Sequence, residues 1–203
     1  MKYIITIGRE YGSGGKEIGL NLANKLGIKC YDKELLTVAS KESGINEDLF
    51  YANDEKQQGS FIYSLMMGTY ALGEGGKIYP DLPLSHKIYL AQFDAIKKVA
   101  SEGPCVIVGR CADYVLREKE NVINVFITAD KEFKVKRLSQ RLSVGEAKAE
   151  DVMNKTDKKR ANYYNFNTES RWGKASNYDL CINSSKVGLD KTVTLIENYI
   201  KLK

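Results

Sequence analysis

A cluster of glycines with one serine and one lysine lies near the start of the chain, in ITIGREYGSGGKEIG at residues 4–18. It follows a short apolar run, and a helical pattern begins after it. Backbone N–H groups of such a turn can surround a phosphate, and the lysine can reach the outer phosphates. We therefore predict a phosphate-binding loop made of Gly12, Ser13, Gly14, Gly15, Lys16 and Glu17.

The loop departs from the usual pattern G-x-x-x-x-G-K-[ST] at two positions. With Lys16 as the lysine, Glu10 occupies the first glycine position. The Ser or Thr that would ligate magnesium is also missing, because Glu17 follows the lysine. Ser13 is the candidate replacement for this metal ligand, on condition that the loop takes a different path.

Length and composition indicate a single globular domain. The chain has 203 residues, of which 43% are hydrophobic and 28% are charged. No apolar run approaches the roughly 20 residues that span a bilayer, and no signal peptide is evident, so we expect a cytoplasmic protein without a membrane partner. The net charge of +5 suits anionic ligands, but an ordinary lysine-rich surface explains it equally well. The four cysteines lie far apart in the sequence, and the chain contains a single histidine. Both facts favour reduced thiols over a zinc site.

Short apolar strands alternate with amphipathic helical patterns along the chain. We expect strands at residues 3–8, 28–31, 104–109, 121–127 and 179–183, and helices at 15–26, 33–43, 86–102, 130–143, 147–165 and 189–202. This alternation predicts an α/β fold in which a five-stranded parallel sheet has helices on both faces. Ligands bind such sheets beyond the carboxyl ends of the strands, where the glycine cluster, Asp32 and Arg110 are expected. Residues 45–85 and 144–177 interrupt the alternation, and we interpret them as insertions over this edge.

With the glycine-rich loop, several later segments resemble the cytidylate kinase-like family, a branch of the P-loop nucleoside monophosphate kinases. They are YDKELL, CVIVGRCADYVL, VFITADKEFKVKRL, TDKKRANYY and NYDLCINSS, in the order of the family and over almost the whole chain. The resemblance implies the three-layer P-loop NTPase fold. It also implies a core (about 1–44, 86–143 and 166–203), an acceptor-binding insertion (about 45–85) and a lid (about 144–165).

The activity that the resemblance implies is transfer of the γ-phosphoryl group of ATP to a nucleoside monophosphate such as CMP or dCMP, with Mg²⁺. Arg137 and Arg141 lie four residues apart on one helical face, like the family's R-x-x-x-R pattern, whose arginines contact the transferring phosphoryl group. Arginines there stabilise the negative charge of the transition state. With Lys16 they are the expected catalytic residues; the alternative for the arginines is a solvated basic helix face.

The resemblance also implies a set of acceptor-binding residues. Asp32 matches the aspartate of the family's LDSGALYR segment, and Arg110 matches the arginine of DGRD, with Asp113 placed slightly beyond it. Asp157 and Arg160 match the D-x-x-R part of a further motif, for which an ordinary ion pair on a helix is the alternative.

One departure weakens the link to cytidine nucleotides. Lys33 replaces the serine that reads the cytosine, and a lysine accepts no hydrogen bond. The sequence therefore does not support cytosine recognition, and a different small-molecule acceptor remains an alternative.

Two further classes of protein remain. A nucleotide-binding regulatory protein with little catalysis is favoured by the missing hydroxyl after Lys16 and opposed by the two arginines. A nucleic-acid-binding domain would use the basic stretch at 155–160, but no recognition motif accompanies that charge, so we expect no nucleic-acid partner. Both a monomer and a homodimer fit the sequence.

Overall fold

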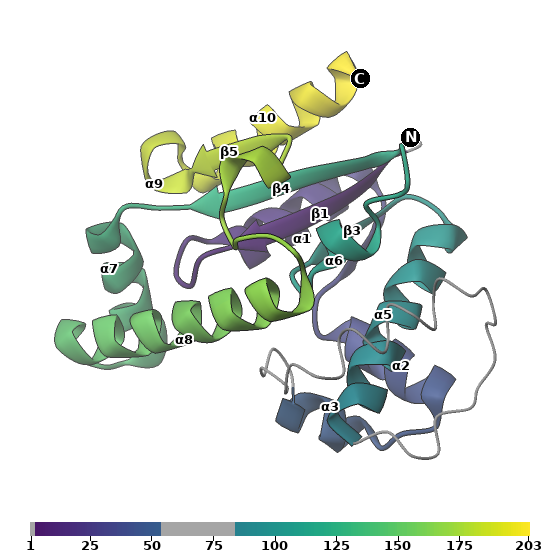
Figure 1. The fold of residues 1–203 in the computed structure, drawn as a ribbon. Helices are drawn as coiled ribbons and strands as arrows, with labels where there is room; N and C mark the ends of the chain where they lie inside the picture. The colour runs from purple at the N-terminus through teal and green to yellow at the C-terminus, as the bar shows by residue number, and fades with distance from the viewer. Residues whose placement is uncertain (1–2, 54–83) are drawn as a thin grey trace.

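The structure is a computed structural model that describes residues 3–53 and 84–203 (Figure 1). Its centre is a five-stranded sheet with the order β2-β3-β1-β4-β5, in which every pair of neighbouring strands is parallel. The strands are β1 (Ile4–Arg9), β2 (Lys29–Tyr31), β3 (Cys105–Val108), β4 (Val122–Thr128) and β5 (Leu180–Asn183). The predicted α/β class and five-stranded parallel sheet are confirmed.

The first strand lies at the middle of the sheet, which explains its apolar sequence. Ile7 pairs in register with Val108 of β3 and Val125 of β4, so β1 is hydrogen-bonded along both edges. Ile5 and Ile7 point to one face and Ile4 to the other, as the alternation of a strand requires. A strand covered on both faces reads as a continuous apolar run rather than as an alternating one.

Helices cover both faces of the sheet (Figure 1). On one face, α1 (Gly15–Leu26) and α10 (Leu189–Leu202) pack against the strands through an aliphatic cluster that includes Ile18, Leu22 and Ile196. The opposite face is covered by α2 (Glu34–Ser43), α3 (Glu47–Asn53), α5 (Leu84–Glu102) and α6 (Ala112–Val115). Helix amphipathicity therefore places the two cores on either side of one sheet, which gives three layers.

Of the remaining elements, three helices follow the carboxyl ends of the strands, and one 3₁₀ turn precedes β5. They are α7 (Lys131–Leu142), α8 (Glu146–Asn167), the 3₁₀ turn η1 (Ala175–Asn177) and α9 (Ser184–Val187). Val135 and Leu138 of α7 pack against Ala149 and Met153 of α8, and Tyr11 of the glycine-rich loop joins this cluster. Both helices are thereby held beside the loop.

The structure describes all of the expected lid but only part of the expected insertion at 45–85. Residues 146–165 of the expected lid belong to the single helix α8. The expected insertion at 45–85 begins with α3, while its residues 54–83 lie outside the described residues. Among the helices of the described ranges, none is both long and apolar enough to cross a membrane.

Candidate active site

The glycine-rich loop connects β1 to α1 with a backbone that glycine permits. Gly12 has a φ of 90° and Gly14 a φ of 82°, in the left-handed region that other residues rarely adopt. Helix α1 then begins at Gly15, so Lys16 lies in its first turn. Free N–H groups at a helix N-terminus next to a lysine can bind an anion, which is the role that the sequence predicts for this loop.

Ser13 is turned into the protein, which corrects one expectation from the sequence. Its side chain is buried, and its hydroxyl donates a hydrogen bond of 2.8 Å to the carbonyl oxygen of Glu10. Its own carbonyl accepts a hydrogen bond of 2.6 Å from the hydroxyl of Ser184. Because the hydroxyl faces away from the loop's outer surface, Ser13 is not placed to ligate magnesium. Ser184, the first residue of α9 and one that sequence reasoning missed, contacts the loop through this hydrogen bond.

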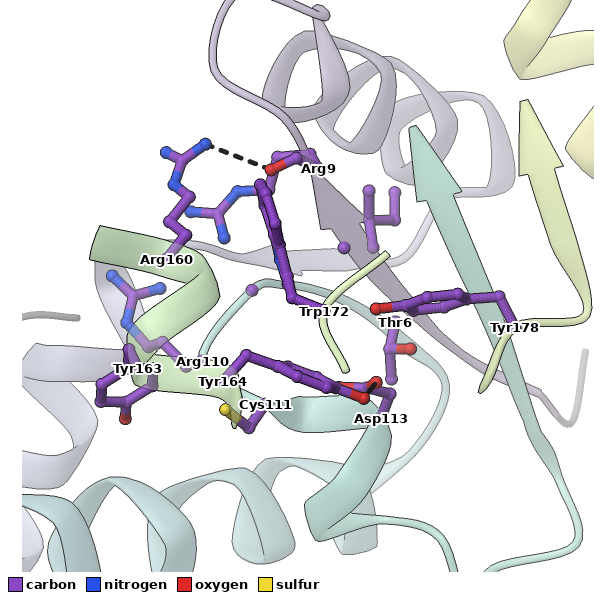
Figure 2. A pocket seen from close by; sticks show the side chains of 13 residues that line it. Thr6, Arg9, Arg110, Cys111, Asp113, Arg160, Tyr163, Tyr164, Trp172 and Tyr178 are labelled. Carbon is purple, nitrogen blue, oxygen red and sulfur yellow. Dashed lines mark hydrogen bonds between the residues drawn. The ribbon is translucent and has the colours of Figure 1, made fainter. Parts of the chain in front are cut away.

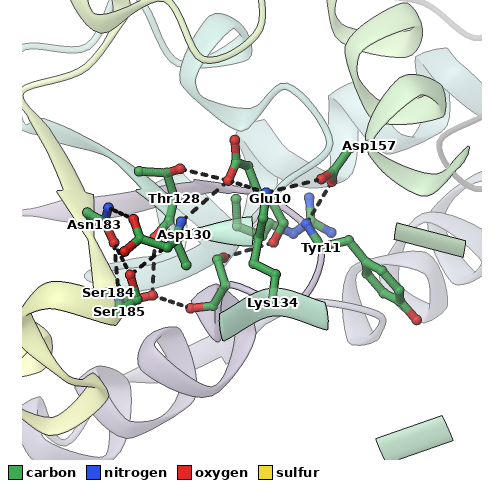
Figure 3. A network of polar contacts seen from close by, with 12 residues as sticks. Glu10, Tyr11, Thr128, Asp130, Lys134, Asp157, Asn183, Ser184 and Ser185 are labelled. Carbon is green, nitrogen blue, oxygen red and sulfur yellow. Dashed lines mark hydrogen bonds and ion pairs between the residues drawn. The ribbon is translucent and has the colours of Figure 1, made fainter. Parts of the chain in front are cut away.

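Glu10 occupies the position of the usual first glycine and anchors the loop (Figure 3). Its carboxylate lies 2.8 Å from Nζ of Lys134 on α7 and accepts a hydrogen bond of 2.7 Å from the hydroxyl of Thr128 at the end of β4. The side chain of Lys134 is almost buried, so this ion pair is shielded from water. The departure from the usual glycine therefore has a structural role.

Asp157 also holds the loop and does not line the cleft described below (Figure 3). Its Oδ1 accepts a hydrogen bond of 2.7 Å from the backbone N–H of Tyr11, and its Oδ2 lies 3.9 Å from Nζ of Lys134. Burial raises the pKa of Asp157 to about 6, although the Tyr11 N–H and the charge of Lys134 act in the opposite direction. In the structure Asp157 therefore contacts the loop, and its expected contact with an acceptor stays a prediction.

A cleft of about 520 Å³ opens over the glycine-rich loop. It brings together most of the residues expected to bind or transfer a phosphoryl group, although they come from five elements of the chain. The predicted residues that line it are Gly12, Gly14, Gly15, Lys16, Glu17, Asp32, Arg110, Arg137, Arg141 and Arg160. Arg9, which sequence reasoning did not single out, lines it too.

Lys16 and Asp32 form an ion pair at the floor of this cleft, with Nζ 2.8 Å from Oδ2. The hydrogen bond from Asp32 raises the pKa of Lys16 above its ordinary value. For Asp32, burial raises the pKa, but the hydrogen bond from Lys16 and the charges of Arg110 and Arg9 outweigh it and bring the pKa below its ordinary value. Both groups are therefore charged at neutral pH.

Arg110 contacts both the backbone and the side chain of Asp32. Its buried guanidinium donates a hydrogen bond of 2.6 Å to the carbonyl oxygen of Asp32 and lies 3.5 Å from its Oδ1. Arg110 and Cys111 have φ values of 53° and 55°, an uncommon conformation for residues other than glycine. Such strained positions concentrate at functional sites, where the surroundings hold them in place.

Arg137 and Arg141 of α7 reach the opposite wall of the cleft. Arg137 forms an ion pair with Glu17, with Nη2 2.8 Å from Oε2. The guanidinium of Arg141 lies 4.9 Å from the centre of the Tyr11 ring, at cation–π distance. The helical spacing predicted that Arg137 and Arg141 share one face of the helix. In the structure this face of α7 lies toward the glycine-rich loop.

A second, smaller cavity of about 20 Å³ adjoins the cleft and has room for about one water molecule (Figure 2). Asp113 lies here and not in the cleft; it accepts a hydrogen bond of 2.7 Å from the hydroxyl of Tyr164. Burial raises the pKa of Asp113, and burial together with the charge of Asp113 raises the pKa of Tyr164. Tyr178 and Trp172 complete an aromatic end of this cavity.

The donor groups around the loop do not form the usual magnesium site of this loop type. The hydroxyl after Lys16 is replaced by Glu17, and the three carboxylates that line the cleft, Glu10, Glu17 and Asp32, are each paired with a cation. Within residues 3–53 and 84–203, no group of three metal-ligating side chains is present. These residues therefore do not fit the usual magnesium site.

A protein-family model described as "Cytidylate kinase-like family" matches residues 4–186. No curated protein matches the chain. Among solved structures, an uncharacterized protein from Eubacterium ventriosum ATCC 27560 is 33% identical, with a TM-score of 0.73 and all of both chains covered.

Two shikimate kinases show a more distant likeness. The one from Bacteroides thetaiotaomicron is 12% identical, with a TM-score of 0.54 and 99% of each chain covered. The one from Acinetobacter baumannii, solved with shikimate, is 15% identical, with a TM-score of 0.51 and 98% of this chain and 93% of that chain covered. At such low identity the likeness concerns the fold alone, which is that of P-loop kinases.

Proposed function

The chain belongs to the cytidylate kinase-like family, and from this premise we propose that it is an ATP-dependent phosphotransferase. The reaction is transfer of the γ-phosphoryl group of ATP to a nucleoside monophosphate such as CMP or dCMP. The observation that carries the proposal is the gathering of Lys16, Arg137 and Arg141 around one glycine-rich loop.

In this proposal the glycine-rich loop binds the phosphate donor, ATP. Backbone N–H groups from Gly12 to Gly15 bind the phosphates of ATP, and Lys16 exchanges the carboxylate of Asp32 for a phosphate oxygen. Arg137 and Arg141 neutralise the charge that the phosphoryl oxygens share in the transition state. Positioning and electrostatics suffice for this transfer, and no covalent intermediate is required.

Asp32, Arg110 and Arg160 supply the acceptor side of the cleft, with Asp113 in the adjoining cavity. Lys33 also lines the cleft, in the place where the family's serine reads cytosine. We therefore propose CMP and dCMP as the first acceptors to test, and a different small molecule as the alternative acceptor.

The division of the chain follows from the same proposal. Residues 1–44, 86–143 and 166–203 form the core, 45–85 bind the acceptor, and 144–165 form the lid. Closure of the lid excludes water, so that the acceptor and not water receives the phosphoryl group. Mg²⁺, which the family resemblance implies, accompanies ATP in this proposal.

The test is ADP release from ATP and Mg²⁺ with CMP, dCMP, UMP, AMP, GMP or no acceptor. We expect turnover with at least one acceptor, and its loss in the Lys16→Ala variant. Lys136→Ala is the matched control, because Lys136 is an exposed lysine on α7 that does not line the cleft. Equal ADP release with and without every acceptor, unchanged by Lys16→Ala, would refute the proposal.

A nucleotide-binding regulatory protein is the second candidate, and the Glu17–Arg137 ion pair favours it. Glu17 occupies the position of the usual metal-binding hydroxyl and engages an arginine that catalysis needs. This candidate predicts ATP binding by calorimetry without product from any acceptor. Turnover with a single acceptor would exclude it.

A further inference from the structure

Lys134 is a nearly buried lysine on α7 that contacts the glycine-rich loop and does not line the cleft. Its side chain is 11% exposed. A lysine is rarely buried unless it has anionic partners, because burial removes the hydration of its ammonium group. The proposed transfer makes no use of this charge, so its burial needs another explanation.

Two carboxylates from different elements surround the ammonium group of Lys134 (Figure 3). Its Nζ lies 2.8 Å from Oε2 of Glu10, at the start of the loop, and 3.9 Å from Oδ2 of Asp157 on α8. Both acids are held in turn, because Glu10 accepts a hydrogen bond from the hydroxyl of Thr128 and Asp157 accepts one from the N–H of Tyr11. Lys134 therefore joins the loop, α7 and α8 at one point.

The loop also meets the backbone of α7 at this point. A Cβ atom on Gly12 would lie 3.0 Å from the carbonyl oxygen of Lys134 and 3.1 Å from the side chain of Leu138. Such a contact is tighter than most that a side chain makes, so glycine permits this close approach. The backbone contact and the ion pairs of Lys134 together set how far α7 lies from the loop.

The same face of α7 carries the two arginines of the cleft. Arg137 and Arg141 lie three and seven residues after Lys134, which places the three side chains along one side of the helix. Arg137 pairs with Glu17, and the guanidinium of Arg141 lies 4.9 Å from the centre of the Tyr11 ring, so both also contact the loop. A rotation or shift of α7 would displace both guanidinium groups from the loop together.

We infer that Lys134 is a positioning residue, which holds α7 against the loop so that Arg137 and Arg141 face the transferring phosphoryl group. The inference rests on the proposed function and deepens it, because it assigns a role to a charged residue outside the cleft. Small displacements matter, since a misplacement of about 1 Å can lower a rate by about a hundredfold. Without the ammonium group, the like charges of Glu10 and Asp157 loosen the contact between the loop and the two helices.

The direct test follows the two arginines by NMR of protein labelled with ¹⁵N-arginine, and it requires no turnover. The Tyr11 ring should shift the Nε–Hε signal of Arg141 in the wild type, and Tyr11→Leu shows the size of this ring-current shift. In Lys134→Met we expect most of that shift to be lost and the signal of Arg137 to move as well. Methionine fills the space of the lysine stem, and thermal unfolding checks that the variant is folded.

Lys131→Met is the matched control, because Lys131 joins the same two helices without the loop. Its Nζ lies 2.6 Å from Oε1 of Glu150 in an exposed ion pair, and it does not line the cleft. The signals of both arginines should keep their wild-type positions in this control.

Glu10→Gln is the second variant, and it weakens the contact from the side of the loop while Asp157 still balances the charge of Lys134. It should move the arginine signals in the same direction as Lys134→Met, and it decides alone if Lys134→Met does not fold. Wild-type arginine signals in the folded variants would overturn the inference.

Steady-state kinetics adds a test that depends on turnover. Lys134→Met should lower kcat about ten- to a hundredfold and change the KM for ATP by less than about threefold. Arg137→Ala should cost about a hundredfold in the wild type but less than about tenfold in Lys134→Met, because the arginine is already displaced there. Fully additive losses in this double-mutant cycle would show that Lys134 acts independently of Arg137, and the inference would fall.

Failure of the proposed function is recognised separately. If no acceptor gives turnover, the kinase proposal fails, and the NMR comparison still decides whether Lys134 places the arginines. If turnover is present but the arginine signals of Lys134→Met and Glu10→Gln match those of the wild type, the kinase proposal stands and the positioning role is refuted.

Discussion

The ammonium group of Lys16 lies 2.8 Å from Oδ2 of Asp32, so the lysine of the glycine-rich loop forms an ion pair with the residue that follows β2. The lysine side chain is 63% exposed, and an ion pair of this kind contributes less than about 1 kcal/mol. In the proposed reaction, a nucleotide phosphate would therefore displace Asp32 from Lys16 at little cost.

Asp32→Asn should separate binding from turnover. Removing the carboxylate frees Lys16, so AMP-PNP affinity should rise by about two- to fivefold in calorimetry. Turnover should fall by about a hundredfold, because the acceptor loses its partner next to Arg110. Glu34→Gln, a nearby exposed carboxylate that does not line the cleft, is the control. Unchanged turnover in Asp32→Asn would contradict this role.

Arg137→Ala should lower kcat by about a hundredfold or more, with a smaller effect on AMP-PNP affinity, because its charge is needed mainly in the transition state. Glu17→Gln releases Arg137 from its ion pair and should not reproduce this loss. Lys136→Ala, on the same helix, should behave like the wild type. Steady-state kinetics of the three variants makes the comparison, and equal kcat in Arg137→Ala and Lys136→Ala would remove Arg137 from the mechanism.

Asp157→Asn should change how stability depends on pH. Burial raises the pKa of Asp157 from 3.8 to about 6, so its contribution to stability is fully present below about pH 4 and is lost as the pH rises through 6. The asparagine keeps an acceptor for the Tyr11 N–H but cannot ionise. The difference in free energy of unfolding between Asp157→Asn and the wild type should therefore shift in favour of the variant by roughly 2 kcal/mol from about pH 4 to pH 8.

Denaturant unfolding across this pH range measures that difference. Asp151→Asn, on the same helix and in a more exposed position, should follow the wild-type pH profile. Parallel profiles for Asp157→Asn and the wild type would show that the carboxyl group titrates normally.

Ser184→Ala should destabilise the glycine-rich loop. The buried hydroxyl donates to the carbonyl oxygen of Ser13 at 2.6 Å, and its loss leaves that carbonyl without its donor from α9. We expect a loss of about 1–3 kcal/mol in the free energy of unfolding and weaker AMP-PNP binding. Ser101→Ala removes an exposed hydroxyl that also donates to a carbonyl, at 2.7 Å, and should cost less than about 0.5 kcal/mol. Equal losses in the two variants would show that Ser184 has no special role.

The sequence by itself determined the architecture and the donor loop. Short apolar strands that alternate with helices require a parallel sheet, because neighbouring parallel strands need a long connection. Helical periodicity placed Arg137 and Arg141 on one face, and glycines after a strand marked the loop. These features are local, so they follow from spacing and residue type alone.

The contacts of the other candidate residues depend on the tertiary structure. Packing of α8 against the loop brings Asp157 to the Tyr11 N–H, 146 residues away in sequence. The left-handed backbone at Arg110 precedes Asp113, which lies in the smaller cavity and not in the cleft.

Ser184 and Arg9 carried no signal in the sequence, because their roles depend on contacts between distant strand ends. Ser184 meets a carbonyl 171 residues away, and Arg9 fits only because Gly109 lies beside it. Local spacing cannot encode such distances, since they depend on which strands become neighbours and on how the helices pack over them. The glycine-rich loop was therefore predictable from local sequence, whereas the side chains around it follow from the packing of distant elements.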